Sequence, residues 1–231
     1  QSLHPRRKQR LEVFYLASVT RYIYDFDALK TFLQVSHNCA NAFKQLRINY
    51  DYEDTEYYRM RMSYGQRAKL FLKEISLHDH LDTLKGPFSL INRLNDLNKY
   101  SQFEVYYDGS GSIDTFRQIQ PRIVSLEFVS NRAFRGTSDM PLLRKLKISL
   151  ISVCPPPRVI EAIKTLVSEL PSSLEVFVLI CHTLSIQYIP ILQAVNEHHK
   201  HCNVSVLLRG RCEDAHAERY GDIANILATT N

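Results

Sequence analysis

One hydrophobic spacing returns along the chain between residues 72 and 208. In its clearest copy, residues 123–131, apolar residues stand at positions 1, 4 and 6, and an Asn stands at position 9. Positions 4 and 6 point to the same face of an extended chain, because side chains alternate with a period of two. Each copy therefore predicts a short strand. Five other copies, at intervals of 20 to 31 residues, begin at Leu72, Tyr100, Leu143, Leu174 and His201.

Helical spacing fills the segments between these predicted strands. Apolar residues three and four apart predict helices over 88–97, 157–170, 185–198 and 213–228. Pro157 suits a first helical turn, whereas Pro190 is expected to kink or interrupt its helix. Strands joined by helices in one sheet run parallel. The predicted fold class is therefore α/β, and the pattern resembles an irregular leucine-rich-repeat-like β–α solenoid with a parallel sheet.

The N-terminal part of the chain follows a different pattern. Residues 11–46 show no strand-like alternation, and their spacing predicts two or three short amphipathic helices, with Asp25 or Asp27 as an N-cap. A small helical subdomain of this kind would cover the open end of a repeat array. The expected organisation is a basic tail over 1–10, a helical cap over 11–46 and a repeat region over 47–231.

The apolar residues of the predicted cap resemble an F-box in their order and spacing. The resemblance implies docking onto the Skp-type adaptor of cullin ubiquitin ligases, with the repeats recognising a client protein. The sequence departs from the family at Glu12, Ser36 and Cys39, where the family has Pro, Cys and Trp. The residues that the resemblance assigns to adaptor binding are Leu11, Leu16, Val19, Tyr22, Leu29 and Val35.

The other interpretation is that the helices have a purely structural role. The protein would then be a leucine-rich-repeat signalling scaffold or a GTPase-binding protein. The sequence identifies neither the partner nor the oligomeric state.

If positions 1, 4 and 6 face the core, positions 3, 5 and 7 form a concave face. This face changes along the repeats from acidic and aromatic, through basic, to apolar. Its apolar end (Val176, Val178, Ile180) marks an interface, or is covered by the C-terminal segment, or indicates a register shifted by one residue. The candidate protein-binding residues are Glu104, Tyr106, Glu127, Lys145, Lys147, Val176, Val178 and Leu207.

Composition narrows the class of protein. The 45% hydrophobic content is ample for a core, and no apolar run approaches the roughly 18 residues of a membrane span. Five scattered cysteines without a Cys-x-x-Cys pair favour a reducing compartment, the cytoplasm or the nucleus. Part of the net charge of +5 lies in residues 6–10, which suit a nuclear address, a phosphate contact or a solvated tail.

Candidate chemistry is sparse. The chain contains no phosphate-binding loop and no hydrolase or metalloprotease motif, so we expect no enzyme, no catalytic residue and no cofactor. Two histidine clusters, 78–82 and 198–202, suit a metal or purely structural roles, and we predict no metal. The tyrosine and arginine run over 57–67 lacks a nucleic-acid-binding motif, so we expect protein partners rather than nucleic acid.

Overall fold

The computed structural model of the 231-residue chain describes residues 12–20, 22–23, 26–49, 63–107, 109–129, 139–150, 155–181 and 186–208. Leu11 and the helix predicted over 213–228 lie outside them. The chain divides into two compact units, residues 1–85 and residues 86–231.

The first unit is helical, as its apolar spacing predicts. Helix α3 packs against both α1 and α2. Leu16 meets Cys39 and Ala42 in one buried cluster, and Leu29 meets Phe43 in another. The described helices of this unit are α1 (Val13–Thr20), α2 (Phe26–Val35), α3 (His37–Lys44) and α5 (Tyr64–Ile75).

Two departures from the F-box pattern take structural roles in this unit. Ser36 caps α3, because its hydroxyl oxygen accepts a hydrogen bond from the backbone N–H of Cys39. Cys39 itself is buried in the helical core. The predicted cap at Asp27 is wrong, since Asp27 lies within the first turn of α2, and Asp25 lies outside the described residues.

The copy of the repeat predicted to begin at Leu72 is not a strand. Residues 72 to 75 belong to α5, and Leu72 is 44% exposed. Positions 1 and 4 of the repeat are three residues apart, which is also a helical spacing. The overlooked signal is a capping box, in which Ser63 and Gln66 bond each other's backbone N–H at the start of α5.

The first strand, β1 (Thr83–Pro87), comes after α5 instead. Ile48 forms a parallel bridge with Thr83 at the start of β1. The buried side chain of Asn49 extends this bridge. Its Nδ2 donates to the carbonyl of Lys85 at 2.7 Å, and its Oδ1 accepts from the Lys85 N–H at 2.5 Å.

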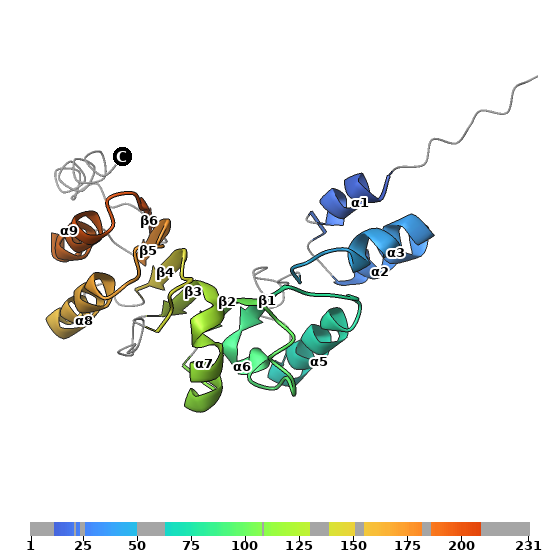
Figure 1. Ribbon diagram of the computed structural model, residues 1–231, viewed down its shortest axis with the longest axis horizontal. Helices are drawn as coiled ribbons and strands as arrows, with labels where there is room; N and C mark the ends of the chain where they lie inside the picture. The colour runs from blue at the N-terminus through green and yellow to red at the C-terminus, as the bar shows by residue number, and fades with distance from the viewer. Residues whose placement is uncertain are drawn as a thin grey trace, which may run out of the picture. The chain divides into compact units, whose positions relative to one another are not determined.

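The strands form one six-stranded parallel sheet whose spatial order follows the chain, β1–β2–β3–β4–β5–β6. Each pair from β2 to β6 is parallel. From β3 to β6, positions 4 and 6 of one copy stand opposite positions 4 and 6 of the next. Between β2 and β3 the register is offset by two residues, so Val105 at position 6 stands opposite Leu126 at position 4. The predicted parallel pairing is confirmed for the five copies after the first (Figure 1). The strands are β2 (Gln102–Tyr107), β3 (Ile123–Val129), β4 (Lys145–Ser149), β5 (Val176–Cys181) and β6 (Asn203–Leu208).

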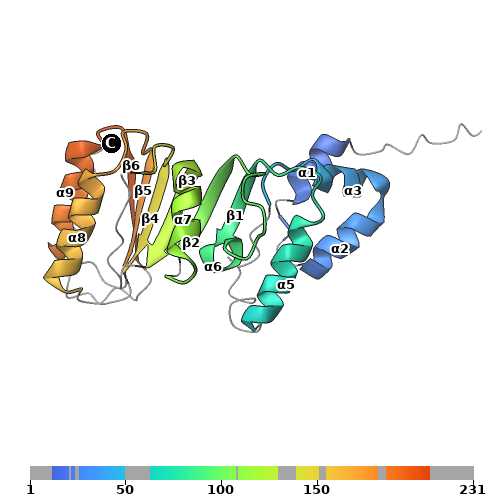
Figure 2. The same cartoon turned by 60° about the horizontal axis from the view of Figure 1, so that its bottom comes forward.

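The core of the second unit lies on the repeat's inner positions. Positions 4 and 6 of β2 to β5 are buried, and helices α7, α8 and α9 lie along one side of these strands, with α8 beside α9 (Figure 2). The described helical elements of this unit are α6 (Phe88–Ile91), α7 (Ile113–Ile119), η2 (Gln120–Arg122), α8 (Pro157–Ser168), η3 (Ile186–Tyr188) and α9 (Ile189–His198).

Two of the predicted helices differ from those observed. The helix expected over 88–97 ends at Ile91, because the N–H groups of Arg93 and Leu94 donate to carbonyls three residues earlier and tighten the chain into turns. Pro190 does not kink α9 but stands in its first turn, where a missing N–H costs no hydrogen bond.

Because inner positions are buried and outer ones are not, substitutions at neighbouring residues of β4 should differ sharply in their cost to stability. We expect Leu146→Ala to lower the free energy of unfolding by about 2–5 kcal/mol, because Leu146 is fully buried and its removal leaves a cavity. Lys145→Ala is the matched control on the exposed side and should cost at most about 0.5 kcal/mol. Equilibrium urea unfolding measures both, and equal costs would contradict the assignment of the two faces.

Candidate protein-binding surfaces

The sheet of the second unit has one face without a described helix, and we call its side chains the helix-free face. They are the predicted positions 3, 5 and 7, and strand register places them in cross-strand rows. The first row is Glu104, Ser125, Lys145, Val176 and Asn203. The second row is Tyr106, Glu127, Lys147, Val178 and Ser205.

Two of the predicted binding residues on this face form an ion pair. The Nζ of Lys147 lies 2.8 Å from Oε2 of Glu127, and the two side chains are 22% and 23% exposed. They occupy directly opposite positions on β4 and β3. The pair neutralises the centre of the second row, so a partner that covers it meets little net charge there.

The apolar end of the helix-free face is largely buried. Val178 pairs in register with Lys147, so the predicted orientation is correct and a shift of one residue is excluded. Val178 and Ile180 are nevertheless buried, Val176 is partly buried, and Leu207 is half exposed. The C-terminal segment proposed to cover them lies outside the described residues. The accessible side chains of the described face therefore lie on β2 to β4 and on β6, on either side of the buried residues of β5.

The helical unit separates the F-box-like residues into two groups. Leu16 and Leu29 are buried in its own core and cannot contact a partner without unfolding. Val19, Tyr22 and Val35 are exposed by 45%, 72% and 71%. Only the second group is available for docking.

Sequence reasoning missed two exposed aromatic residues on α1. Phe14 and Tyr15 are 73% and 60% exposed, and their rings meet edge to face at 5.9 Å. Helix α1 contains no charged residue, so it is apolar on its inner and outer sides alike. A surface helix of a soluble unit ordinarily carries charges on its outer side, and their absence from α1 is the signal that could have identified this surface.

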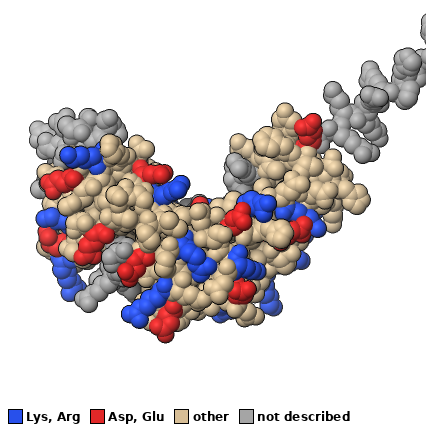
Figure 3. Space-filling view, in the orientation of Figure 1, with Lys and Arg blue, Asp and Glu red and all other residues tan. Residues whose placement is uncertain are grey.

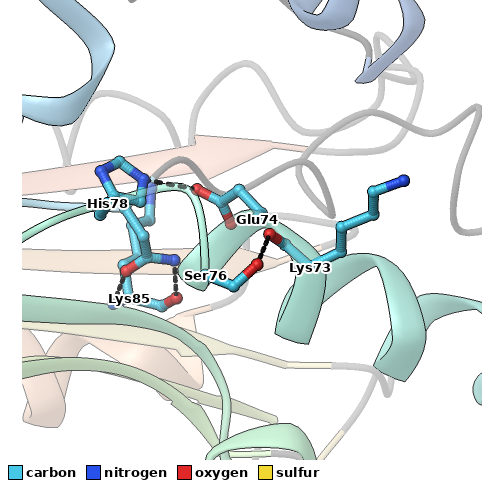
Figure 4. A network of polar contacts seen from close by, with 6 residues as sticks. Lys73, Glu74, Ser76, His78 and Lys85 are labelled. Atoms are coloured by element: carbon cyan, nitrogen blue, oxygen red, sulfur yellow. Dashed lines mark hydrogen bonds and ion pairs between the residues drawn. The ribbon is translucent and has the colours of Figure 1, made fainter. Parts of the chain in front are cut away.

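The first histidine cluster contains a buried polar pair rather than a binding face (Figure 4). Glu74 and His78 are positions 3 and 7 of the copy that begins at Leu72, so the repeat predicts them on the concave face, but they lie at the end of α5. Oε1 of Glu74 is 3.4 Å from Nε2 of His78, and their side chains are 1% and 0% exposed. The ring of Phe43 lies 4.4 Å from the His78 ring. The pair fixes the end of α5 against α3.

The two carboxylates of this cluster, Asp79 and Asp82, face basic side chains rather than a histidine. Asp79 lies 3.6 Å from Lys44, and Asp82 lies 3.9 Å from Arg47. No group of three metal-ligating side chains occurs among the residues that the structure describes. In the second histidine cluster, buried His199 has a structural role, because its Nε2 donates to the carbonyl of Val167 at 3.0 Å and so ties α9 to α8.

The pKa values of Cys181 and Cys202 do not suit a nucleophilic role. Burial raises the pKa of the Cys181 thiol from about 9 to about 11. Burial likewise raises the pKa of Cys202 to about 11, although a backbone hydrogen bond at Phe177 works in the opposite direction. A nucleophilic cysteine needs a lowered pKa, so both thiols are unreactive near neutral pH.

The described surface carries mixed charges. Basic and acidic side chains are interspersed on the face shown in Figure 3, where no continuous basic field covers the described residues. Within the described ranges, no helix has the length and apolar character needed to cross a membrane.

Comparison of the chain with protein-family models, with curated proteins and with solved structures found no match.

The buried polar pair predicts a stability cost at Glu74. We expect Glu74→Ala to destabilise the protein by about 1–3 kcal/mol, because it leaves His78 buried without this partner. Glu74→Gln keeps a hydrogen-bonding group of the same shape and should cost less. Lys69→Ala, at an exposed position of the same helix, is the control. Urea unfolding followed by circular dichroism measures all three, and a harmless Glu74→Ala would contradict the role of the pair.

The raised thiol pKa values predict a loss of stability at alkaline pH. Above pH 9 the thiols ionise in the unfolded chain but stay protonated in the folded one, so folding loses up to about 2–3 kcal/mol per thiol by pH 11. Thermal unfolding between pH 8 and pH 11 should therefore show a flatter pH dependence for the Cys181→Ala, Cys202→Ala double variant than for wild type. Ser205→Ala, at an exposed position of β6, should follow the wild type. Parallel curves for the double variant and wild type would refute the prediction.

Proposed function

We propose that this chain is a non-catalytic recognition protein with two binding surfaces. The helical unit docks onto a Skp-type adaptor of cullin ubiquitin ligases, as an F-box does. The helix-free face of a leucine-rich-repeat-like sheet recognises a client protein. The observation that carries the proposal is the uncharged helix α1, which leaves two aromatic rings largely exposed.

Exposed aromatic side chains support docking on energetic grounds. Fully burying a large apolar side chain is worth about 1.5–3 kcal/mol, so leaving several of them in water forgoes a substantial gain. Tyr15, Val19 and Tyr22 follow the i, i+4, i+7 spacing, which places them on one side of α1 and its terminal turn. A continuous apolar stripe of this kind suits a hydrophobic groove on a partner.

The sheet supports recognition rather than catalysis. In open α/β sheets, ligand sites form where the strand order reverses. The order here follows the chain from β1 to β6 without a reversal, so the topology provides no crevice of that type. What the sheet offers instead is a row-by-row arrangement of charged and aromatic side chains on one face, which suits a protein surface.

The second candidate is a leucine-rich-repeat signalling scaffold, or a GTPase-binding protein, with helices that only cap the sheet. The burial of Leu16 and Leu29 in the helical core favours it, because a structural cap needs those residues and no adaptor. The two candidates differ in what they require of the outer side of α1.

The deciding experiment is a pull-down of the purified chain with a Skp-type adaptor. We expect wild type to bind, and Tyr15→Ser combined with Val19→Ser to weaken binding at least about tenfold, because exposed apolar anchors dominate such interfaces. These side chains are exposed, so the double variant should keep the circular dichroism spectrum and melting temperature of wild type.

The matched control is Gln34→Ala, at an exposed polar position of α2, which should leave adaptor binding unchanged. Absence of adaptor binding by folded wild type would remove the F-box-like function and leave the structural cap. Equal binding by wild type and the double variant would place the docking surface elsewhere.

A further inference from the structure

The first row of the helix-free face presents two charges that do not neutralise each other. Glu104 on β2 and Lys145 on β4 both stand opposite Ser125 on β3, so the three residues form one line across the strands. Glu104 is partly buried and Lys145 is exposed. Neither side chain forms an ion pair with any residue that the structure describes.

In the second row of the same sheet, by contrast, the acidic and the basic side chain form an ion pair. Glu127 and Lys147 stand on neighbouring strands and meet at 2.8 Å. In the first row the acid and the base are separated by an intervening strand, and the side chain between them is the short Ser125. From β2 to β4, this row therefore presents a negative side chain, a short neutral one and a positive one. A partly buried carboxylate without a counter-ion is costly, and a cation from a partner would offset that cost.

The distance between Glu104 and Lys145 indicates which backbone conformation a bound peptide would need in order to contact both charges. Two strand intervals separate Glu104 from Lys145 by about 9–10 Å along the row. Side chains on one face of an extended β-strand are about 7 Å or 13 Å apart, and neither distance matches. A polyproline II helix repeats every three residues at about 3.1 Å per residue, so residues i and i+3 share a face about 9 Å apart.

A neighbouring aromatic residue agrees with that backbone. Tyr106 follows Glu104 by two positions on β2 and lies on the same face, beside the negative side chain of the row. Proline-rich segments in the polyproline II conformation dock against aromatic side chains, and their pre-formed backbone loses little entropy on binding.

We propose that the row Glu104–Ser125–Lys145 binds a polyproline II segment of the client with a basic and an acidic residue three positions apart. The basic residue lies over Glu104, and the acidic residue lies over Lys145. This inference rests on the proposed function, because it gives the chemistry of the client that the helix-free face recognises.

The experiment uses the full chain and two fluorescent peptides that share one composition. One carries Lys-Pro-Pro-Glu and the other carries Glu-Pro-Pro-Lys, each within the same proline-rich flanks. Fluorescence anisotropy gives the dissociation constant of each peptide at low and at high salt. We expect wild type to bind one of the two peptides about tenfold more tightly. When the peptide backbone runs in a single direction across the row, only one order of charges places its Lys over Glu104 and its Glu over Lys145. The preference should shrink at high salt.

The decisive variant exchanges the two charges. Glu104→Lys combined with Lys145→Glu should reverse the preferred peptide order, which a nonspecific loss of structure could not do. The matched control exchanges the exposed pair Glu161 and Lys164 on α8, whose side chains lie 3.9 Å apart, and it should keep the wild-type preference.

Two further peptides test the spacing. A peptide with the charges two positions apart should bind at least about tenfold more weakly, because its charges lie about 6 Å apart along a polyproline II helix. A stapled α-helical peptide with the charges seven positions apart spans about 10.5 Å on one face. Preferential binding of the helical peptide would overturn the polyproline II assignment.

Failure of this inference can be distinguished from failure of the proposed function. If the chain binds the adaptor but shows no preference between the two peptide orders, the client chemistry proposed here is wrong and the F-box-like role stands. If it shows the reversible preference without binding the adaptor, the row is a peptide site on a protein that does not serve a ubiquitin ligase.

Discussion

The second unit depends on the burial of two apolar positions per strand. From β3 onward, positions 4 and 6 of neighbouring copies stand opposite one another in the parallel register, and with those of β2 they form the layer that the helices cover. Single strands of five to seven residues could not bury these side chains alone, so each strand is stable only beside its neighbours. The period of two then decides the rest. Once Leu146 and Ile148 face inward, Lys145 and Lys147 have to face outward.

The parallel register that aligns the buried positions also determines which side chains are neighbours on the outer face. Residues that are distant in the sequence, such as Glu127 and Lys147, become direct neighbours because their strands are in register. Strand order follows chain order, so the sheet has no reversal at which a crevice for a small ligand would form. This ordered arrangement of side chains on one face supports our proposal that the sheet recognises a protein partner.

In the helical unit, one apolar pattern supplies both buried and exposed side chains. Helix α1 turns Leu16 inward, where it meets α3, and leaves Tyr15 and Val19 in solvent. Because α1 is apolar on both sides, the F-box-like spacing does not by itself separate core residues from docking residues. The buried pair of Glu74 and His78 adds a fixed polar contact beneath Phe43 at the end of α5. This unit therefore combines a buried core with one helix, α1, that carries no charge on its exposed side.

The sequence by itself determined the five strands from β2 to β6, helix α8 and the two faces of the sheet, because local side-chain periodicity fixes them. It did not determine whether the copy at Leu72 is a strand, since residues three apart fit both a helix and the repeat, and the Ser63 capping box decided for the helix. Only the tertiary structure decided that Val178 is buried on its outward face, that Leu16 is unavailable for docking, and that Glu104 and Lys145 lack partners among the described residues. These properties depend on which segments meet in space, and no local pattern records that information.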